Sequence, residues 1–317
     1  MTQAPPGPSS DTPVLRLGTR RSPLAMAQAE EARRRLCTAH GWEADRVELV
    51  PVVASGDKVQ DRPLAEIGGK ALWTRELDLW LAEGRIHASV HSLKDVETMR
   101  PDAFTFGAFL PRADRRDRLI GPASLADLPP GATIGTSAPR RAAQAMKARP
   151  DCRVVMFRGN VATRLAKLEA GEADATFLAA AGLDRLDLEE TGTPLDPEHW
   201  LPAPSQGAIA LECRVGDDHT MGLLAAVDHA PTRAEVLAER AFLAGLQGTC
   251  HSPIALWCRR DGAVMRMDAA IYSEDGHDGV SGAKRFEEGD LDAVAVFAGA
   301  LLAEAPDTIR RLFGTTA

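Results

Sequence analysis

GTRRSP at residues 18–23 and GTSAPRR at residues 135–141 decide the fold, because each joins a short apolar strand to a helix. VLRL, residues 14–17, precedes the first segment, and ATIGT, residues 132–136, leads into the second. RGNVATRLAKL, residues 158–168, is a third junction of this kind. Strands that alternate with helices predict a mostly parallel sheet covered on both faces. The two matching segments therefore predict two α/β halves with a cleft between them.

Local signals place the first helices and strands. Ser22 suits the N-cap of a helix and Pro23 its first position, while Asn160 is expected to cap the helix that follows it. The run at 47–53 is apolar enough for a buried strand, and residues 70–83 have the periodicity of a helix.

The pattern changes after about residue 229, where a third domain is expected to begin. Thr232 and Glu235 form a capping box ahead of the helical segment VLAERAFLAGL. Asp261-Gly262 predicts a hairpin turn between two strands, and a last helix is expected from about residue 290. We expect a disordered leader (1–13), a first α/β domain (14–112 and 208–226), a second α/β domain (115–201) and a small α+β domain (229–317).

Composition narrows the classes of function. A net charge of -8 gives no general attraction to nucleic acid, and no apolar run approaches the roughly 18 residues that a membrane span needs. The N-terminal segment lacks the basic start and apolar region of an export signal. These features predict a cytoplasmic protein without nucleic-acid or membrane partners. The cysteines lack C-x-x-C spacing and nearby paired histidines, which argues against a metal site.

One cysteine stands out by its position. Cys250 lies in a loop between Gly248 and Pro253, whereas the other cysteines mostly lie in helix or strand patterns. It is therefore the candidate nucleophile. Its place just past a helix C-terminus would not lower its pKa, which argues against a protease-type pair with His251. On the residues alone, a buried or incidental cysteine remains the better-supported interpretation.

Basic and acidic residues at the strand ends suggest a site for anions. Helix N-termini expose unpaired N–H groups, so arginines at the three junctions are candidates to bind carboxylates. These residues are Arg20, Arg21, Arg140, Arg141, Arg158 and Arg164. They could instead pair with acidic residues on a solvated face. HSLKD places His91, Lys94 and Asp95 at another strand end, where Asp95 could stabilise a cation or simply form a cap or salt bridge.

An ordered series of motifs resembles that of the porphobilinogen deaminase (hydroxymethylbilane synthase) family. The order and spacing of the series cover residues 14 to about 258. Its members are GTRRSPLAMAQ, GDKVQDRPLAEIGGKALWTRELDLWL, HSLKDV, GTSAPRR, FRGNVATRLAKL, PAPSQGAIALECR and ERAFLAGLQGTCHSPI.

The resemblance implies a fold and an activity. The fold would have two α/β domains similar to type II periplasmic binding proteins around a cleft, and a small C-terminal α+β domain. Cys250 would carry a dipyrromethane cofactor through a thioether. Asp95 would offset the positive charge that appears when ammonia leaves porphobilinogen. The implied enzyme is a monomeric transferase that adds four porphobilinogen units and releases hydroxymethylbilane.

The resemblance also assigns residues to the cofactor and the substrate. Besides Cys250, it implies cofactor binding by Ser92, Lys94, Thr136, Ser137, Arg140, Arg141 and Arg164. It implies substrate binding by Arg20, Ser22, Lys70, Arg158, Arg185 and Gln206. No metal is implied.

The chain departs from the usual pattern of the family at Glu66, Glu97, Ala138, Pro139, Ser205 and Thr249. These departures leave reduced activity open. A non-catalytic carboxylate-binding protein of the periplasmic type and a cysteine hydrolase that uses Cys250 and His251 also remain open.

Overall fold

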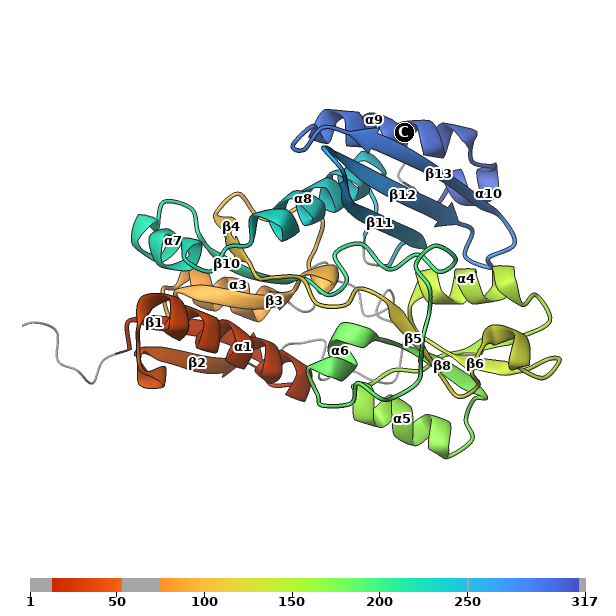
Figure 1. The fold of residues 1–317 in the computed structure, drawn as a ribbon, viewed down its shortest axis with the longest axis horizontal. Coiled ribbons are helices and arrows are strands. Elements are labelled where there is room, and N and C mark those ends of the chain that lie inside the picture. Colours follow the sequence, from red (N-terminus) through yellow and green to blue (C-terminus); the bar gives the residue numbers. More distant parts are fainter. Residues whose placement is uncertain (1–12, 53–73, 250, 314–317) are drawn as a thin grey trace, which may run out of the picture.

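The structure is a computed structural model that describes residues 13–52, 74–249 and 251–313 (Figure 1). Two five-stranded sheets and one three-stranded sheet organise this part of the chain. We call them the first lobe, the second lobe and the C-terminal unit. Lys70, Glu66 and Cys250 lie outside the described residues.

The first lobe is built on the sheet β2-β1-β3-β10-β4. Strands β1, β2 and β3 are parallel, whereas β10 is antiparallel to both of its neighbours. The strands are β1 (Leu15–Arg20), β2 (Val47–Val52), β3 (Ala88–Ser92), β4 (Phe104–Phe109) and β10 (Ile209–Arg214). The helices are α1 (Pro23–His40), η1 (Ala44–Arg46), α3 (Arg75–Ala82), η3 (Leu93–Asp95) and α7 (Asp218–Ala225).

The second lobe repeats this arrangement in the sheet β7-β6-β8-β5-β9. Strand β5 is the antiparallel member here, and it follows β4 of the first lobe directly in sequence. The strands are β5 (Asp117–Ile120), β6 (Thr133–Gly135), β7 (Arg153–Val155), β8 (Ala175–Ala179) and β9 (Thr193–Pro194). The helices are η4 (Leu125–Asp127), α4 (Pro139–Ala148), α5 (Val161–Glu169) and α6 (Ala180–Asp184).

Each lobe thus receives its antiparallel strand from a segment that crosses over from the opposite lobe. Figure 1 shows the two lobes beside each other, with the C-terminal unit against both. Two α/β lobes and a small C-terminal α+β unit are the arrangement that the resemblance implies. The predicted fold class is therefore confirmed.

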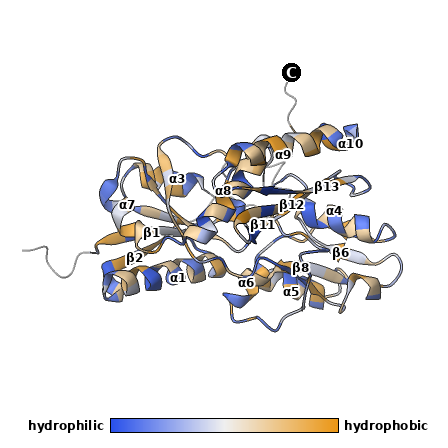
Figure 2. Ribbon diagram, turned by 45° about the horizontal axis from the view of Figure 1, so that its top comes forward, coloured by the Kyte–Doolittle hydropathy of each residue, from blue (hydrophilic) through white to orange (hydrophobic). Residues whose placement is uncertain are grey.

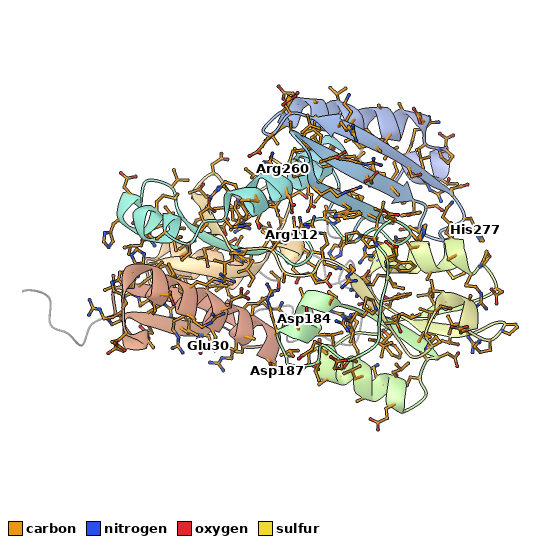
Figure 3. All side chains as sticks on the ribbon, in the orientation of Figure 1. Glu30, Arg112, Asp184, Asp187, Arg260 and His277 are labelled. Atoms are coloured by element: carbon orange, nitrogen blue, oxygen red, sulfur yellow. The ribbon has the colours of Figure 1, made fainter. Side chains whose placement is uncertain are left out.

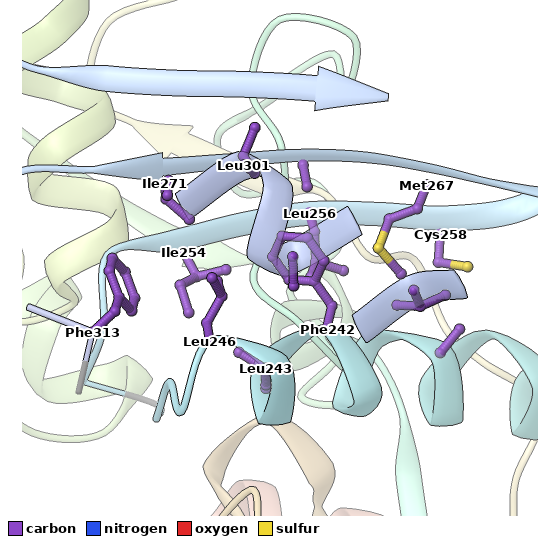
Figure 4. Close-up of a cluster of buried hydrophobic side chains, with 14 of the residues drawn as sticks. Phe242, Leu243, Leu246, Ile254, Leu256, Cys258, Met267, Ile271, Leu301 and Phe313 are labelled. Carbon is purple, nitrogen blue, oxygen red and sulfur yellow. The ribbon is translucent and has the colours of Figure 1, made fainter. Parts of the chain in front are cut away.

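The C-terminal unit combines three helices with one antiparallel sheet. Its elements are α8 (Ala230–Gly245), β11 (Ile254–Asp261), β12 (Val264–Tyr272), β13 (Gly279–Phe286), α9 (Leu291–Glu304) and α10 (Asp307–Arg310). Phe242 of α8, Leu301 of α9 and Ile271 of β12 meet in one buried cluster (Figure 4). Burial of such side chains is the main favourable term in folding. Figure 2 shows that hydrophobic and hydrophilic residues occur in both the helices and the strands.

Two of the expected helix caps are confirmed. The Ser22 hydroxyl accepts a hydrogen bond from the Ala25 N–H at 3.3 Å, and Pro23 occupies the first position of α1. Asn160 Oδ1 accepts one from the Thr163 N–H at 2.9 Å at the start of α5. Local side-chain chemistry therefore starts these helices as the sequence predicts.

Two details of the C-terminal unit differ from the prediction. The capping box at Thr232 is wrong, because α8 begins earlier and His229 is its N-cap, with its ring accepting from the Thr232 N–H. The hairpin turn comes one residue later than predicted. Asp261 still pairs with Val264 in the sheet, so the two loop residues are Gly262 and Ala263.

Buried ion pairs join the crossing segment between β4 and β5 to helix α8. Arg112 lies at the centre of the molecule, between the lobes and the C-terminal unit (Figure 3). It donates to Glu239 at 2.8 Å and to Glu235 at 3.1 Å, and Arg115 donates to Glu235 at 2.9 Å. These contacts fix the C-terminal unit against the crossing segment. In the described part of the chain, no helix is long and apolar enough to cross a membrane.

Candidate active site

A pocket lies at the carboxyl ends of β1 and β3, where open α/β sheets present functional side chains. It brings together three residues expected in the site, namely Arg20, Ser92 and Asp95. Its full lining is Arg20, Ala25, Gln28, Thr74, Leu77, Val90, His91, Ser92, Asp95 and Val96.

Asp95 lies where the two lobes and the C-terminal unit converge. It ends η3, directly after β3 of the first lobe. Burial lowers the pKa of Arg164 in the second lobe and of His251 in the C-terminal unit, and the negative charge of Asp95 partly opposes both shifts. Among the described residues, no hydrogen bond or salt bridge engages the Asp95 carboxylate, so its oxygens can accept from a ligand.

Lys94, next to Asp95, is a strongly perturbed cation. Burial lowers its pKa to about 8, and the positive charges of Arg141 and Arg140 act in the same direction, whereas Asp95 and Asp117 oppose the shift. A lysine that lies among like charges in this way would be stabilised by an added anion.

Arg164 has the same character on the second lobe. Burial lowers its pKa to about 10, and the charges of Arg141 and Arg158 act in the same direction. Its Nε donates to the Gly159 carbonyl at 3.0 Å, which orients the guanidinium at the start of α5. The side of the second lobe that faces Asp95 is therefore crowded with cations.

Asp117, which sequence reasoning missed, holds two of these arginines. Its carboxylate is fully buried and accepts from Arg140 Nη1 at 2.6 Å and Arg141 Nη2 at 2.7 Å. Trp200 Nε1 donates to it at 2.9 Å. Burial alone would raise the pKa of Asp117, but the two arginines outweigh burial and hold it well below its usual range. Asp117 is thus the charged partner that orients Arg140 and Arg141.

Gln206 links this carboxylate to Lys94. Its Nε2 donates to Asp117 Oδ1 at 2.9 Å, and its Oε1 accepts from Lys94 Nζ at 3.4 Å. The side chain is fully buried in the crossing segment between β9 and β10. Gln206 therefore connects the cation next to Asp95 with the arginine pair of the second lobe.

The hydroxyl side chains expected in the site differ in their hydrogen bonds and in their exposure. Gln28 Nε2 donates to Ser92 Oγ at 2.6 Å inside the pocket, and Thr136 Oγ1 accepts from the Ala138 N–H at 3.2 Å. Ser137 is exposed beside it. Ser22 is engaged as the cap of α1.

Arg185 forms a bridge between the lobes rather than lining the pocket. Its Nε lies 3.1 Å from Glu31 Oε2 on α1, and its Nη2 donates to the Gly207 carbonyl at 3.2 Å. A substrate that used Arg185 would have to share it with Glu31.

A second buried carboxylate, Glu212, also escapes sequence reasoning. It accepts from Arg100 Nε at 2.8 Å and lies 3.1 Å from His91 Nε2. Arg100 further contacts Asp78 and Glu97. Burial would raise the pKa of Glu212, but His91 and Arg100 lower it to about 2. His91 thus connects the pocket to a buried charged network.

The structure gives some of the departures from the family pattern a local role. Glu97 accepts from Arg100 at 2.8 Å and from the Thr74 hydroxyl at 3.0 Å. Thr249 Oγ1 accepts from the His251 N–H at 3.1 Å. Ala138 occupies the N-cap of α4 without a side-chain hydrogen bond. Ser205 is buried with φ at 60°, and its hydroxyl has no partner in the described residues.

The chemistry of the donors fits a ligand with several carboxylates. Lys94 and Arg164 have lowered pKa values among like charges, and Arg140 Nε is buried without a hydrogen-bond partner in the described residues. The balancing carboxylates of this cluster are Asp95 and Asp117. Fold and site together define a two-lobed α/β protein in which a cluster of buried cations lies beside a carboxylate.

Comparison with protein families narrows this class. Residues 15–222 match the model "Porphobilinogen deaminase, dipyromethane cofactor binding domain", and residues 233–302 match "Porphobilinogen deaminase, C-terminal domain". The chain belongs to the porphobilinogen deaminase family. The resemblance found in the sequence motifs is therefore confirmed.

Two relatives carry the name porphobilinogen deaminase. The protein of Sphingopyxis alaskensis is 57% identical over 308 residues, which cover 95% of this chain and 97% of that protein. The protein of Nitrobacter winogradskyi is 45% identical over 310 residues, with 96% of each chain covered.

Solved structures with a similar fold include periplasmic proteins. A periplasmic substrate-binding protein of an ABC transporter from Coxiella burnetii is 17% identical, with a TM-score of 0.41, and the match covers 71% of this chain and 94% of that one. The periplasmic VFT2 domain of BvgS from Bordetella pertussis is 16% identical, with a TM-score of 0.39 and coverage of 67% and 86%.

Proposed function

We propose that this transferase condenses four porphobilinogen molecules head to tail, with loss of ammonia, and releases hydroxymethylbilane. Membership of the porphobilinogen deaminase family supports this reaction. The observation that carries the proposal is the place of Asp95, which lines a pocket and lies in the field of cations from the second lobe.

Asp95 is the proposed catalytic residue. Loss of ammonia leaves a positive charge on the substrate pyrrole, and a carboxylate already in place stabilises such a charge without reorganisation. Its oxygens would also accept hydrogen bonds from pyrrole N–H groups. Leu77, Val90 and Val96 give the pocket an apolar wall, beside which the attraction between the carboxylate and the cation is stronger than in water.

When bound, the dipyrromethane supplies a covalently anchored primer with a free pyrrole α-carbon and several carboxylates. Cys250 is the proposed anchor. The residues proposed to hold its carboxylates and ring N–H groups are Ser92, Lys94, Thr136, Ser137, Arg140, Arg141 and Arg164. Each charge-assisted hydrogen bond to a carboxylate contributes roughly 1.5 to 3 kcal/mol in a partly buried site. Asp117 and Gln206 fix Arg140, Arg141 and Lys94 in advance, which lowers the entropy lost on binding.

The substrate is proposed to use another set of polar groups. These are Arg20, Ser22, Lys70, Arg158, Arg185 and Gln206. Arg20 is best supported, because it lines the pocket with Asp95. To bind substrate, Arg185 would have to release Glu31 and pair with a substrate carboxylate instead, and this would weaken the contact between the lobes.

Domain limits and assembly are also proposals. The crossing segments support a first domain at 14–112 with 208–226, a second at 115–201 and a third at 229–317. A monomer acting in the cytoplasm remains a prediction from the sequence.

The intact mass of the purified protein tests the proposal directly. A dipyrrole linked to Cys250 should add to the mass and give a coloured Ehrlich reaction, and Cys250→Ser should lose both. Cys37→Ser is the matched control, because this half-buried thiol lies on α1, far from the loop in sequence. Asp95→Asn should keep the fold and lose ammonia release.

Each competing function gives a different result. A carboxylate-binding protein would keep Cys250 as a free thiol even after incubation with porphobilinogen. A cysteine hydrolase would show rapid alkylation of Cys250 by iodoacetamide at neutral pH. Near-normal ammonia release by Asp95→Asn would exclude the proposed role of Asp95.

A further inference from the structure

His91 lies in the pocket with one ring nitrogen fixed and one unused. It belongs to β3, is 4% exposed and lines the same pocket as Asp95. Its Nε2 lies 3.1 Å from Glu212 Oε2. In the described residues no hydrogen bond uses its Nδ1. A buried polar side chain with an unused nitrogen at a pocket points to a ligand.

Glu212 determines which nitrogen of His91 carries the hydrogen. The carboxylate is fully buried and accepts from Arg100 Nε at 2.8 Å and Nη2 at 2.9 Å, which keeps it ionised. An ionised carboxylate can only accept hydrogen bonds, so His91 Nε2 must donate. In the neutral ring, the lone pair is then on Nδ1. This is the arrangement of a histidine base oriented by a carboxylate.

We propose that His91 is the base that removes the α-proton of the acceptor pyrrole after each new unit is joined, an inference that rests on the proposed function. Formation of the carbon–carbon bond leaves the positive charge on the acceptor ring. The C–H bond at its α-carbon then breaks, and the electron pair restores the aromatic pyrrole. The proton moves to His91 Nδ1, and ammonia has already left with the electron pair of the carbon–nitrogen bond.

A base separate from Asp95 has a physical advantage. Asp95 must stay ionised, because the next cation forms beside it as soon as another substrate loses ammonia. If Asp95 took the proton, it would lose its charge in each cycle. A neutral imidazole is also the stronger base, with an ordinary pKa near 6.5 against about 3.9 for an aspartate. Glu212 stabilises the imidazolium that forms, as the carboxylate does in Ser-His-Asp enzymes.

Charged groups from several elements surround His91. Asp78 on α3 is close enough for its pKa to respond to the charge of His91. The groups to consider are Arg20 at the end of β1, Asp78 on α3, Asp95 in η3, Arg100 beyond η3 and Glu212 on β10. The single positive charge of Arg100 is shared by the carboxylates of Glu212 and Asp78. This group of three side chains therefore has a net negative charge, which would attract the imidazolium.

Porphobilinogen deuterated at the free α-carbon tests the role of His91. In His91→Gln, kcat should fall roughly 100-fold, the usual contribution of a general base. Breakage of the C–H bond should then limit the rate, so a deuterium isotope effect well above that of the wild type should appear. His40→Gln is the matched control, because this half-buried histidine is the last residue of α1 and its Nε2 contacts the Leu223 carbonyl of α7. It should behave as the wild type.

The isotope effect is a ratio, so it does not depend on how much of a variant folds. If His91→Gln keeps both the rate and the isotope effect of the wild type, His91 is not the base. If the wild type itself releases no ammonia from porphobilinogen, the proposed function fails, which is a different result.

Nitrogen NMR of ring-labelled histidine gives a readout without turnover. In the wild type, His91 should carry its hydrogen on Nε2 near neutral pH. Hydrogen on Nδ1 in the neutral ring would overturn the proposal.

Discussion

Asp117→Asn removes the charge that holds Arg140 and Arg141 while changing the shape of the side chain very little. In the wild type this carboxylate is fully buried and binds both arginines within 2.7 Å. The variant leaves two buried guanidinium groups with only carbonyl and amide partners, such as the Phe177 carbonyl and Gln144. Breaking a buried ion pair from one side costs about 3 to 5 kcal/mol. We expect a loss of this size in the free energy of unfolding.

Urea unfolding measured by circular dichroism and by tryptophan fluorescence provides the assay. Fluorescence is informative because Trp200 donates to Asp117 at 2.9 Å and stacks on Phe177. Asp127→Asn is the matched control in the same lobe, since Asp127 is exposed and accepts only from Ser124. Its free energy of unfolding should change by less than about 0.5 kcal/mol.

The contribution of Asp117 to the free energy of unfolding should depend on pH in a definite direction. The pKa of Asp117 is held well below its ordinary value by the arginines. Its contribution to stability is therefore present above the unfolded pKa of about 3.9 and is lost as pH falls toward the folded pKa. The difference between the wild type and Asp117→Asn should shrink in acid. A variant as stable as the Asp127→Asn control at pH 7 would refute the view that Asp117 anchors the arginine pair.

Two further predictions concern backbone strain and a titrating lysine. Ser205→Gly should raise the free energy of unfolding, measured in urea, by about 1 kcal/mol. The variant relieves a φ of 60° and removes a buried hydroxyl without a partner in the described residues. A lower stability would show that Ser205 is not strained. In the wild type, kcat/KM for porphobilinogen should fall above pH 8, where Lys94, with its pKa of about 8, loses its charge. Lys94→Arg should extend activity to higher pH, and an identical alkaline limb in that variant would show that Lys94 does not cause it.

The starts of helices can be predicted from the sequence because their causes are local. Ser22, Pro23 and Asn160 act within one helical turn, so their residue types and spacing contain the information. The prediction fails at Thr232, where Pro231 lies in the first turn and His229 takes over the cap. The repeated strand and junction pattern is likewise enough to predict two lobes of the same kind.

The partners of the site residues cannot be predicted in this way, because they are distant in sequence. His91 and Glu212 are 121 positions apart, and Gln206 and Asp117 are 89 apart. Their contacts depend on the order of strands in each sheet and on the crossing segments. A single sequence contains no local signal that Asp117 will be a buried partner of Arg140 rather than a surface acid.

The carboxylates of the site are of two kinds, those paired with arginines and one that is not. Asp117 and Glu212 are fully buried, and arginines hold each of them ionised. In the described part of the chain, Asp95 has no such partner, although Lys94 and Arg164 lie within its field. If those cations bound Asp95 directly, its oxygens would already be occupied and its charge neutralised before a substrate cation formed. By holding Arg140 and Arg141 on the second lobe, Asp117 leaves the Asp95 carboxylate available, so the same architecture can bind a polyanion and still stabilise a cation beside it.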